Sequence, residues 1–234
     1  MKPKLYTFGC SYTNYEWATW ADIMALDQDR ELVNLGLPGT GNVSMMHRML
    51  QCDIVHQPSA QDWVCVLWTT WPREDRIIAG RWWHLGNVLT YAEHKQKQQD
   101  INVLNNVRFI KHAWNEDWDV IKNCTAIITA QKILPITIQA TVQDLTQLYP
   151  QHVKYQSRLP KMLYIDCDSV DHDRNNYDIE DTHPGIIQQA EICKRMLQTI
   201  GIQDLQPSTW QWVMAEEDRL KNSPPQPHDI GLFC

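Results

Sequence analysis

Short apolar runs alternate with longer segments of helical spacing along most of the chain. Five runs have the length and the β-branched and aromatic content of strands: 4–9, 31–35, 63–69, 133–142 and 161–168. The run at 63–69 is apolar almost without interruption, as in a central strand covered on both faces. This alternation predicts a parallel sheet with helices on both sides.

Helices are expected between the strands, at about 14–27, 43–55, 116–132 and 184–200. Asn14 is well placed to start the first helix. Pro184 suits the first turn of the last helix, with Thr182 or His183 at its cap. Right-handed crossovers then produce a three-layer α/β/α sandwich of about five strands, a flavodoxin-like α/β fold.

The length of 234 residues suits one domain, which we place at 1–203. Within it, residues of about 72–115 lose the alternating pattern and become polar and aromatic, so we interpret them as an insertion with some helix. Residues 204–234 form a C-terminal tail without sustained periodicity from Pro207 onward.

Charge and hydropathy exclude several kinds of partner. The chain carries 21 Lys and Arg against 28 Asp and Glu, a formal charge of -7, and no basic run with interleaved aromatics. Nucleic acid is therefore not an expected partner. No window approaches the roughly 20 apolar residues of a membrane span, and the N-terminal apolar run is too short for a signal peptide. We expect a cytoplasmic protein with no membrane partner, and an oligomer or larger assembly is left open.

Metal and cofactor motifs are not found. The seven cysteines are scattered without a C-x-x-C pair, so reduced thiols are expected. The segment Asp171-x-Asp173-x-Asn175 opens like a calcium loop, but Asn176 stands where the turn glycine belongs and Thr182 where the closing glutamate belongs. We therefore expect no metal and no cofactor.

Ser11 follows the first strand in a predicted strand, turn and helix. There its hydroxyl can be exposed at the head of the sheet, with amides of the helix start facing an oxyanion. A serine nucleophile also needs a histidine base and a group that orients the imidazole. Ser11 as a simple helix cap is the structural alternative. The neighbouring Cys10 is expected to point the opposite way, into the core.

The segment E-D-T-H-P-G at 180–185 contains a base and two acids. Asp181 lies two residues before His183 and Glu180 three before it, and either carboxylate can orient the ring. In parallel sheets the ligand site lies beyond the carboxyl ends of the strands. This rule brings His183 together with the loops that follow the first three strands.

Three blocks, taken in order, resemble the SGNH/GDSL hydrolase family over about residues 4–200. Gly9-Cys10-Ser11-Tyr12-Thr13 is similar to its first block, with Cys in place of Asp, and Asn34 to Gly39 is similar to the second. Asp181-Thr182-His183-Pro184 approaches the last. The resemblance implies an esterase in which Ser11 is the nucleophile, His183 transfers the proton, Asp181 orients the ring and Gly39 contributes to the oxyanion hole.

The chain departs from the family at the third block, which supplies an oxyanion asparagine. The corresponding stretch reads Thr69-Thr70-Trp71-Pro72-Arg73. Arg73, as a cationic donor, or the amide of Asn42 could take that place. Trp71 is assigned to substrate binding because aromatic faces stack on sugar rings and acyl groups, and packing beneath the insertion is its alternative.

These observations predict a serine ester hydrolase of SGNH type. Its partner would be a small-molecule or glycan ester, for example an O-acetyl ester. Two alternatives stay open. One is a catalytically weak or inactive SGNH-fold binding or structural module, which the missing asparagine motivates. The other is an acyltransferase that passes the same acyl group to a hydroxyl acceptor.

Overall fold

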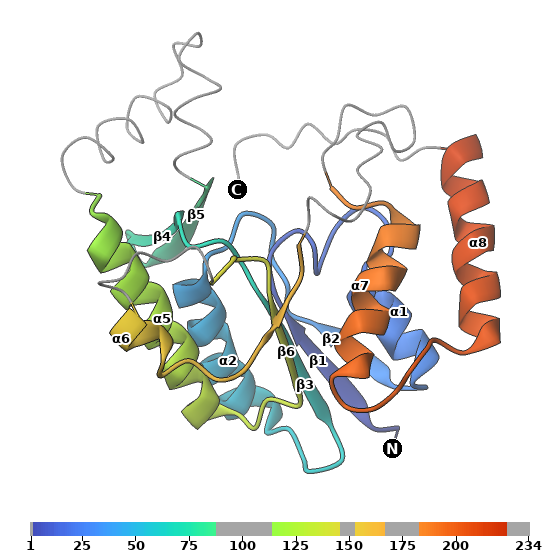
Figure 1. Ribbon diagram of the computed structural model, residues 1–234, viewed down its shortest axis with the longest axis horizontal. Coiled ribbons are helices and arrows are strands. Elements are labelled where there is room, and N and C mark those ends of the chain that lie inside the picture. The colour runs from blue at the N-terminus through green and yellow to red at the C-terminus, as the bar shows by residue number, and fades with distance from the viewer. Residues whose placement is uncertain (1, 88–113, 146–152, 167–182, 224–234) are drawn as a thin grey trace, which may run out of the picture.

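The computed structural model describes residues 2–87, 114–145, 153–166 and 183–223. Its centre is a five-stranded sheet in the order β2-β1-β3-β6-β7, and all of its paired strands are parallel (Figure 1). The strands are β1 (Lys4–Phe8), β2 (Glu31–Asn34), β3 (Trp63–Trp68), β6 (Ile138–Thr141) and β7 (Leu163–Tyr164). The strand order reverses between β1 and β3, so the carboxyl ends of these two strands mark the expected position of a ligand site.

Helices cover both faces of this sheet (Figure 1). One face carries α1 (Trp20–Asp27) and α7 (Ile186–Gln198), with α8 (Pro207–Asn222) packed outside them. The other carries α2 (Asn42–His56) and α5 (Glu116–Ile133), and the short α6 (Val153–Gln156) contacts α5. The predicted α/β architecture, with a parallel sheet of five strands, is confirmed.

Alternation along the strands divides the interior into two apolar cores. Leu5 and Leu67 face α1 and α7, whereas Phe8 and Val66 face α2 and α5. Cys10 continues the second set and is 1% exposed. The prediction that the Cys10 side chain points into the core is therefore confirmed, because neighbouring residues of an extended chain face opposite ways.

The prediction that the chain after Pro207 lacks regular structure is wrong, because residues 207–222 form α8. Pro207 occupies the first turn, which tolerates the missing N–H. Thr209, Val213 and Leu220 are buried at helical spacing, and the latter two join the core of α1 and α7. The apolar stripe is narrow and charged residues interrupt it, so the sequence of this segment shows no sustained periodicity.

Shortening Leu220 tests whether α8 is part of the folded core. The side chain is 1% exposed, so Leu220→Ala should lower the free energy of unfolding by about 2 to 5 kcal/mol through lost burial and a residual cavity. Urea denaturation followed by circular dichroism measures this change. Met214→Ala on the same helix is the control, since Met214 is 50% exposed and should change stability little. Equal effects would contradict the packing of α8.

The first helix begins later than predicted. Residues 10–19 are not helical, and α1 starts at Trp20 after the cap residue Thr19, whose N–H donates to the carboxylate of Asp22. Asn14, the predicted start, donates its side-chain amide to the carbonyl of Gly36 instead. A contact to the β2 loop thus overrides the local capping preference.

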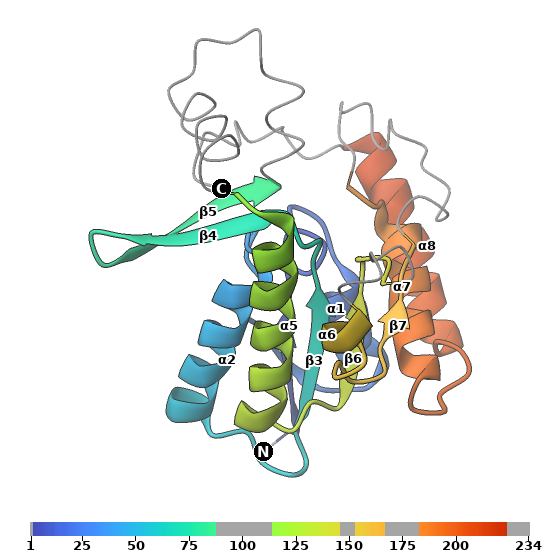
Figure 2. The same ribbon diagram turned by 60° about the vertical axis from the view of Figure 1, so that its left-hand side comes forward.

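The insertion is also different from the prediction in its described part. Instead of helix, β4 (Arg73–Ile78) and β5 (Arg81–Asn87) form an antiparallel hairpin that lies at the N-terminal end of α2 (Figure 2). Ala79 and Gly80 both have positive φ, the geometry of a two-residue hairpin turn. Residues 88–113 lie outside the described residues. Among the helices that are described, none combines the length and apolarity needed to cross a membrane.

Candidate active site

Ser11 lies in a tight turn directly after β1. The N–H of Thr13 donates to the carbonyl of Cys10 over 2.9 Å, which closes the turn. Ser11 is 6% exposed and sits at the carboxyl end of the central strands. Because α1 begins only at Trp20, the predicted contribution of helix-start amides beside Ser11 does not apply. The main-chain amides of the turn and of neighbouring loops are the donors left in this region.

Gly9 allows this turn to form. A Cβ at this position would lie 1.9 Å from Oγ1 of Thr13 and 3.2 Å from the carbonyl oxygen of Leu67. The Thr13 hydroxyl is itself fixed, since it accepts a hydrogen bond from the indole of Trp20 over 3.1 Å. The close approach of the chain to Thr13 and β3 therefore requires glycine.

His183 meets Ser11 across 172 residues of sequence. Its Nε2 lies 2.8 Å from Oγ of Ser11, within the range of a hydrogen bond. Nδ1 is therefore the ring nitrogen that would donate a hydrogen bond to an orienting acid, as in serine triads. Both acids considered for that task, Asp181 and Glu180, lie outside the described residues.

Aromatic residues of the 10–19 loop hold the histidine. The ring of Tyr15 stacks on His183 with centroids 4.0 Å apart and planes 22° apart, and Tyr12 meets it edge-on at 5.8 Å. The indole of Trp17 donates to the carbonyl of Pro184 over 2.9 Å. These three residues were not identified from the sequence, although the pattern Y-x-x-Y-x-W after Ser11 was the available signal.

The helix after His183 begins two or three residues later than predicted, so Pro184 precedes its cap instead of lying in its first turn. Gly185 is the cap residue of α7, and its N–H donates to the side chain of Gln188 over 2.7 Å. His183 is therefore not the cap, and Thr182, the other predicted cap, lies outside the described residues. The histidine consequently precedes the helix, where its ring is positioned by contacts to the 10–19 loop.

Asn34 links the loop after β2 to the loop of Ser11. Its side-chain oxygen accepts from the N–H of Gly36 over 3.0 Å, and its amide donates to the carbonyl of Thr13 over 2.7 Å. Further along this loop, Gly39 is buried and has φ +75°, a conformation that favours glycine. Asn34 thus contributes to the hydrogen bonds that join the second predicted block to the first.

Asn42 does not have the role predicted for it. Its amide donates to the carbonyl of Thr69 over 3.1 Å and to Oδ1 of Asn123 over 2.8 Å, while its oxygen accepts from the N–H of Thr69. Both amide hydrogens are therefore used within the protein, and neither is left for an oxyanion. Asn42 instead fixes the end of β3 against α2 and α5.

Trp71 also needs correction as a substrate-binding residue. It is 4% exposed and packs in an apolar cluster with Val120 and Cys124 of α5. Packing under α5 therefore replaces the predicted stacking on substrate. Arg73 begins β4, and its Nε is buried without a hydrogen-bond partner in the described part of the chain.

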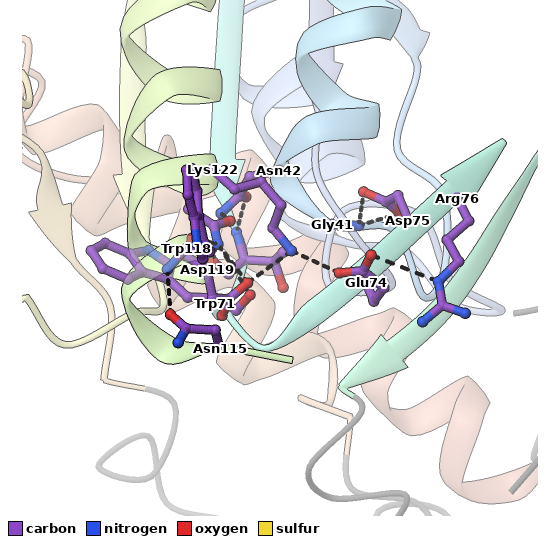
Figure 3. A network of polar contacts seen from close by, with 12 residues as sticks. Gly41, Asn42, Trp71, Glu74, Asp75, Arg76, Asn115, Trp118, Asp119 and Lys122 are labelled. Atoms are coloured by element: carbon purple, nitrogen blue, oxygen red, sulfur yellow. Dashed lines mark hydrogen bonds and ion pairs between the residues drawn. The ribbon is translucent and has the colours of Figure 1, made fainter. Parts of the chain in front are cut away.

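A charged network links the hairpin to α5. Lys122 of α5 lies 2.8 Å from both Glu74 and Asp119, and Arg76 lies 3.7 Å from Glu74 (Figure 3). Burial raises the pKa of the Asp119 carboxyl to about 6, against the opposing effect of the Lys122 ammonium. The Asp119 carboxyl is therefore mostly ionised above that pH.

Within the described ranges, no three His, Cys, Asp or Glu side chains gather as metal ligands would. The cysteines described are buried, free thiols: Cys10, Cys52, Cys65, Cys124 and Cys193.

Comparison with known proteins identifies no family by sequence. No family model matches the chain, and no curated protein matches it. Among solved structures, the chain is similar to a member of the lipolytic protein G-D-S-L family from Veillonella parvula DSM 2008. The two are 8% identical, with 94% of this chain and 98% of that chain covered and a TM-score of 0.34. A similarity of this degree supports no statement about function.

Proposed function

We propose that this protein is a serine ester hydrolase of SGNH/GDSL type. The observation that carries the proposal is the 2.8 Å contact between Oγ of Ser11 and Nε2 of His183 at the carboxyl ends of β1 and β3. A histidine nitrogen at this distance can accept the serine proton, which converts a weak nucleophile into an effective one. The strand order supports the same location for a ligand.

The reaction proceeds through an acyl-serine. Oγ of Ser11 attacks the ester carbonyl carbon while Nε2 of His183 takes the hydroxyl proton, and the histidine then returns that proton to the departing alcohol. In the second half, water attacks the acyl carbon while His183 takes a proton from it; the acyl–Oγ bond then breaks, the histidine returns that proton to Oγ of Ser11, and the carboxylic acid leaves. Asp181 is assigned the orientation of Nδ1, in agreement with the ring nitrogen that faces away from Ser11.

The oxyanion is assigned to main-chain amides and one cation. The N–H groups of Ser11 and Gly39 are the proposed amide donors, supported by the turn after β1 and by the positive φ of Gly39. Arg73 is the proposed third donor, supported by its buried Nε, which has no hydrogen-bond partner among the described residues. A guanidinium donates strong hydrogen bonds to a negative oxygen.

The substrate class proposed is a small or carbohydrate-linked ester, such as an O-acetyl ester. The support is the hairpin beside the Gly39 loop, which carries Trp82 and the 45% exposed Trp83. Aromatic faces of this kind stack on sugar rings.

Labelling of the wild-type protein with a fluorophosphonate tests the proposal. Oγ of an activated serine displaces fluoride from phosphorus, so we expect a covalent adduct that peptide mass spectrometry locates at Ser11. Turnover of p-nitrophenyl acetate should accompany it and should stop as the adduct forms. A protein that forms no adduct and releases no p-nitrophenol under these conditions would contradict an esterase and favour a non-catalytic module.

A further inference from the structure

The hairpin places a buried carboxylate against the loop that follows Gly39. Asp75 of β4 has a side chain that is 1% exposed. Its oxygens accept from the N–H of Gly41 over 2.9 and 3.1 Å (Figure 3). They also accept from the N–H of Ser44 over 3.1 Å. One carboxylate thus satisfies two of the amides that the start of α2 leaves without partners.

Asp75 performs the task of a helix cap from a distant part of the chain. Gly41 is the cap residue of α2 and has no side chain to cap it, and Asp75 lies 34 residues further along the sequence. A Cβ on Gly41 would lie 2.7 Å from Oδ2 of Asp75 and 3.0 Å from the carbonyl of Arg73. Glycine at position 41 therefore admits the hairpin, and the negative charge is favourable at a helix N-terminus.

His84 holds this carboxylate in place. It lies opposite Asp75 in the hairpin register, and its Nδ1 is 2.8 Å from Oδ1 of Asp75. The His84 ring is 8% exposed and lies parallel to Trp82 at 6.4 Å, and Trp82 in turn packs against His47 of α2 at 5.3 Å. The Asp75 carboxylate thus contacts His84 within the hairpin and the backbone amides at the start of α2.

The clamped segment adjoins the proposed oxyanion donor. Only Thr40 separates Gly41 from Gly39, and Thr40 is fully buried, with its N–H donating to the carbonyl of Leu37 over 3.3 Å. The Gly41 amide, fixed by Asp75, is therefore two residues from Gly39, and its position constrains the short stretch of backbone that leads back to the Gly39 N–H. Displacements of about 1 Å at such positions reduce turnover by about 10²-fold.

We propose that Asp75, held by His84, is a positioning residue that fixes the oxyanion loop of the 37–41 segment. This inference rests on the proposed function, and it gives the hairpin insertion a role in catalysis. Asp75 itself touches no substrate; it acts through the amide of Gly41.

Asp75→Asn tests the inference, because it keeps the side-chain shape and removes the charge that two amides and His84 share. We expect kcat for p-nitrophenyl acetate to fall by about 10²-fold with KM unchanged. The affinity for 1,1,1-trifluoro-2-butanone should fall by the same factor. This ketone forms a hemiketal with Ser11 whose negative oxygen occupies the oxyanion hole, so its affinity reports on that hole.

Glu74→Gln is the matched control. Glu74 is the neighbouring hairpin residue and pairs with Lys122 of α5, away from Gly41. It should weaken the attachment of the hairpin while leaving kcat and ketone affinity unchanged. Equal losses in the two variants would mean that the hairpin merely stabilises the fold, and wild-type values in Asp75→Asn would overturn the inference directly.

A second variant covers the case in which Asp75→Asn does not fold. His84→Phe keeps an aromatic ring beside Trp82 and deletes the donor to Asp75, with an expected loss of about 3- to 10-fold in kcat. Unchanged kcat in this variant would overturn the inference. A wild-type protein that neither labels at Ser11 nor hydrolyses the ester would overturn both the proposed function and this inference. An active wild-type protein whose hairpin variants are unaffected would overturn this inference alone.

Discussion

Replacing Ser11 with alanine is expected to reduce ester hydrolysis by about 10⁴- to 10⁶-fold and to abolish fluorophosphonate labelling. The hydroxyl oxygen of Ser11 lies 2.8 Å from Nε2 of His183, and alanine removes the atom that would form the acyl bond. The side chain is small and 6% exposed, so the fold should be retained. Release of p-nitrophenol and intact-protein mass spectrometry measure the two effects.

Ser59→Ala is the matched control for this substitution. Ser59 lies in an exposed turn ahead of β3, at the opposite end of the sheet from Ser11, and its hydroxyl bonds to Asp62. It should keep both turnover and labelling. If Ser11→Ala still hydrolyses the ester or still takes up the label, the nucleophile is a different residue.

Replacing His183 with alanine is expected to reduce turnover by about 10⁴-fold or more, because no base then takes the Ser11 proton. The ring also occupies the space against Tyr15, at a centroid distance of 4.0 Å. Its removal leaves a slot of imidazole size beside Ser11. Added imidazole should therefore restore part of the activity, which p-nitrophenyl acetate hydrolysis at increasing imidazole concentration measures.

The double variant gives an independent check on this pair. Two residues that act as a unit are strongly non-additive, so Ser11→Ala with His183→Ala should be no slower than Ser11→Ala alone. His56→Ala is the control, since His56 is an exposed histidine at the end of α2 that contacts Tyr6. Independent losses that add in the double variant would contradict a shared catalytic step.

The strands of the sheet were predictable because burial on two faces leaves a direct trace in the sequence. β3 is the clearest example: every residue from Trp63 to Trp68 is apolar, and all but Trp63 are buried. The ends of the strands were harder to place. The strand predicted at 133–142 is β6 at Ile138–Thr141, because α5 continues to Ile133.

Two helices differ from the sequence-based prediction, for opposite reasons: α1 begins later than expected, and α8 forms where no helix was expected. The region from Asn14 to Thr19 has a suitable starting residue, but the contacts of Tyr15 with His183 and of Trp17 with Pro184 hold it open. In α8 the buried apolar positions are few, and its burial depends on packing against α1 and α7. Tertiary contacts decided both cases over local preference.

In the candidate site, too, some features could be predicted from local sequence and others depend on tertiary contacts. Ser11 and His183 could be selected from local blocks and from the rule that places ligands beyond the carboxyl ends of parallel strands. Two other features could not be predicted: the hydrogen bonds that occupy the Asn42 side chain, and the burial of Trp71. They depend on Asn123 and on the apolar cluster of Val120 and Cys124, which α5 brings from a distant part of the chain. The capping of Gly41 by Asp75 was likewise hidden, because capping patterns in sequence are local and this one spans 34 residues.

The local sequence pattern was thus sufficient to predict the α/β class, the central strands, and Ser11 and His183 as the candidate residues. Each of these depends on hydrophobic periodicity or on the residue types near one turn. The meeting of that serine and histidine across 172 residues, the aromatic support of the imidazole and the clamp on the 37–41 loop depended on three-dimensional packing. These contacts join segments far apart in the chain, and side chains brought together only by folding leave no fixed spacing in the sequence.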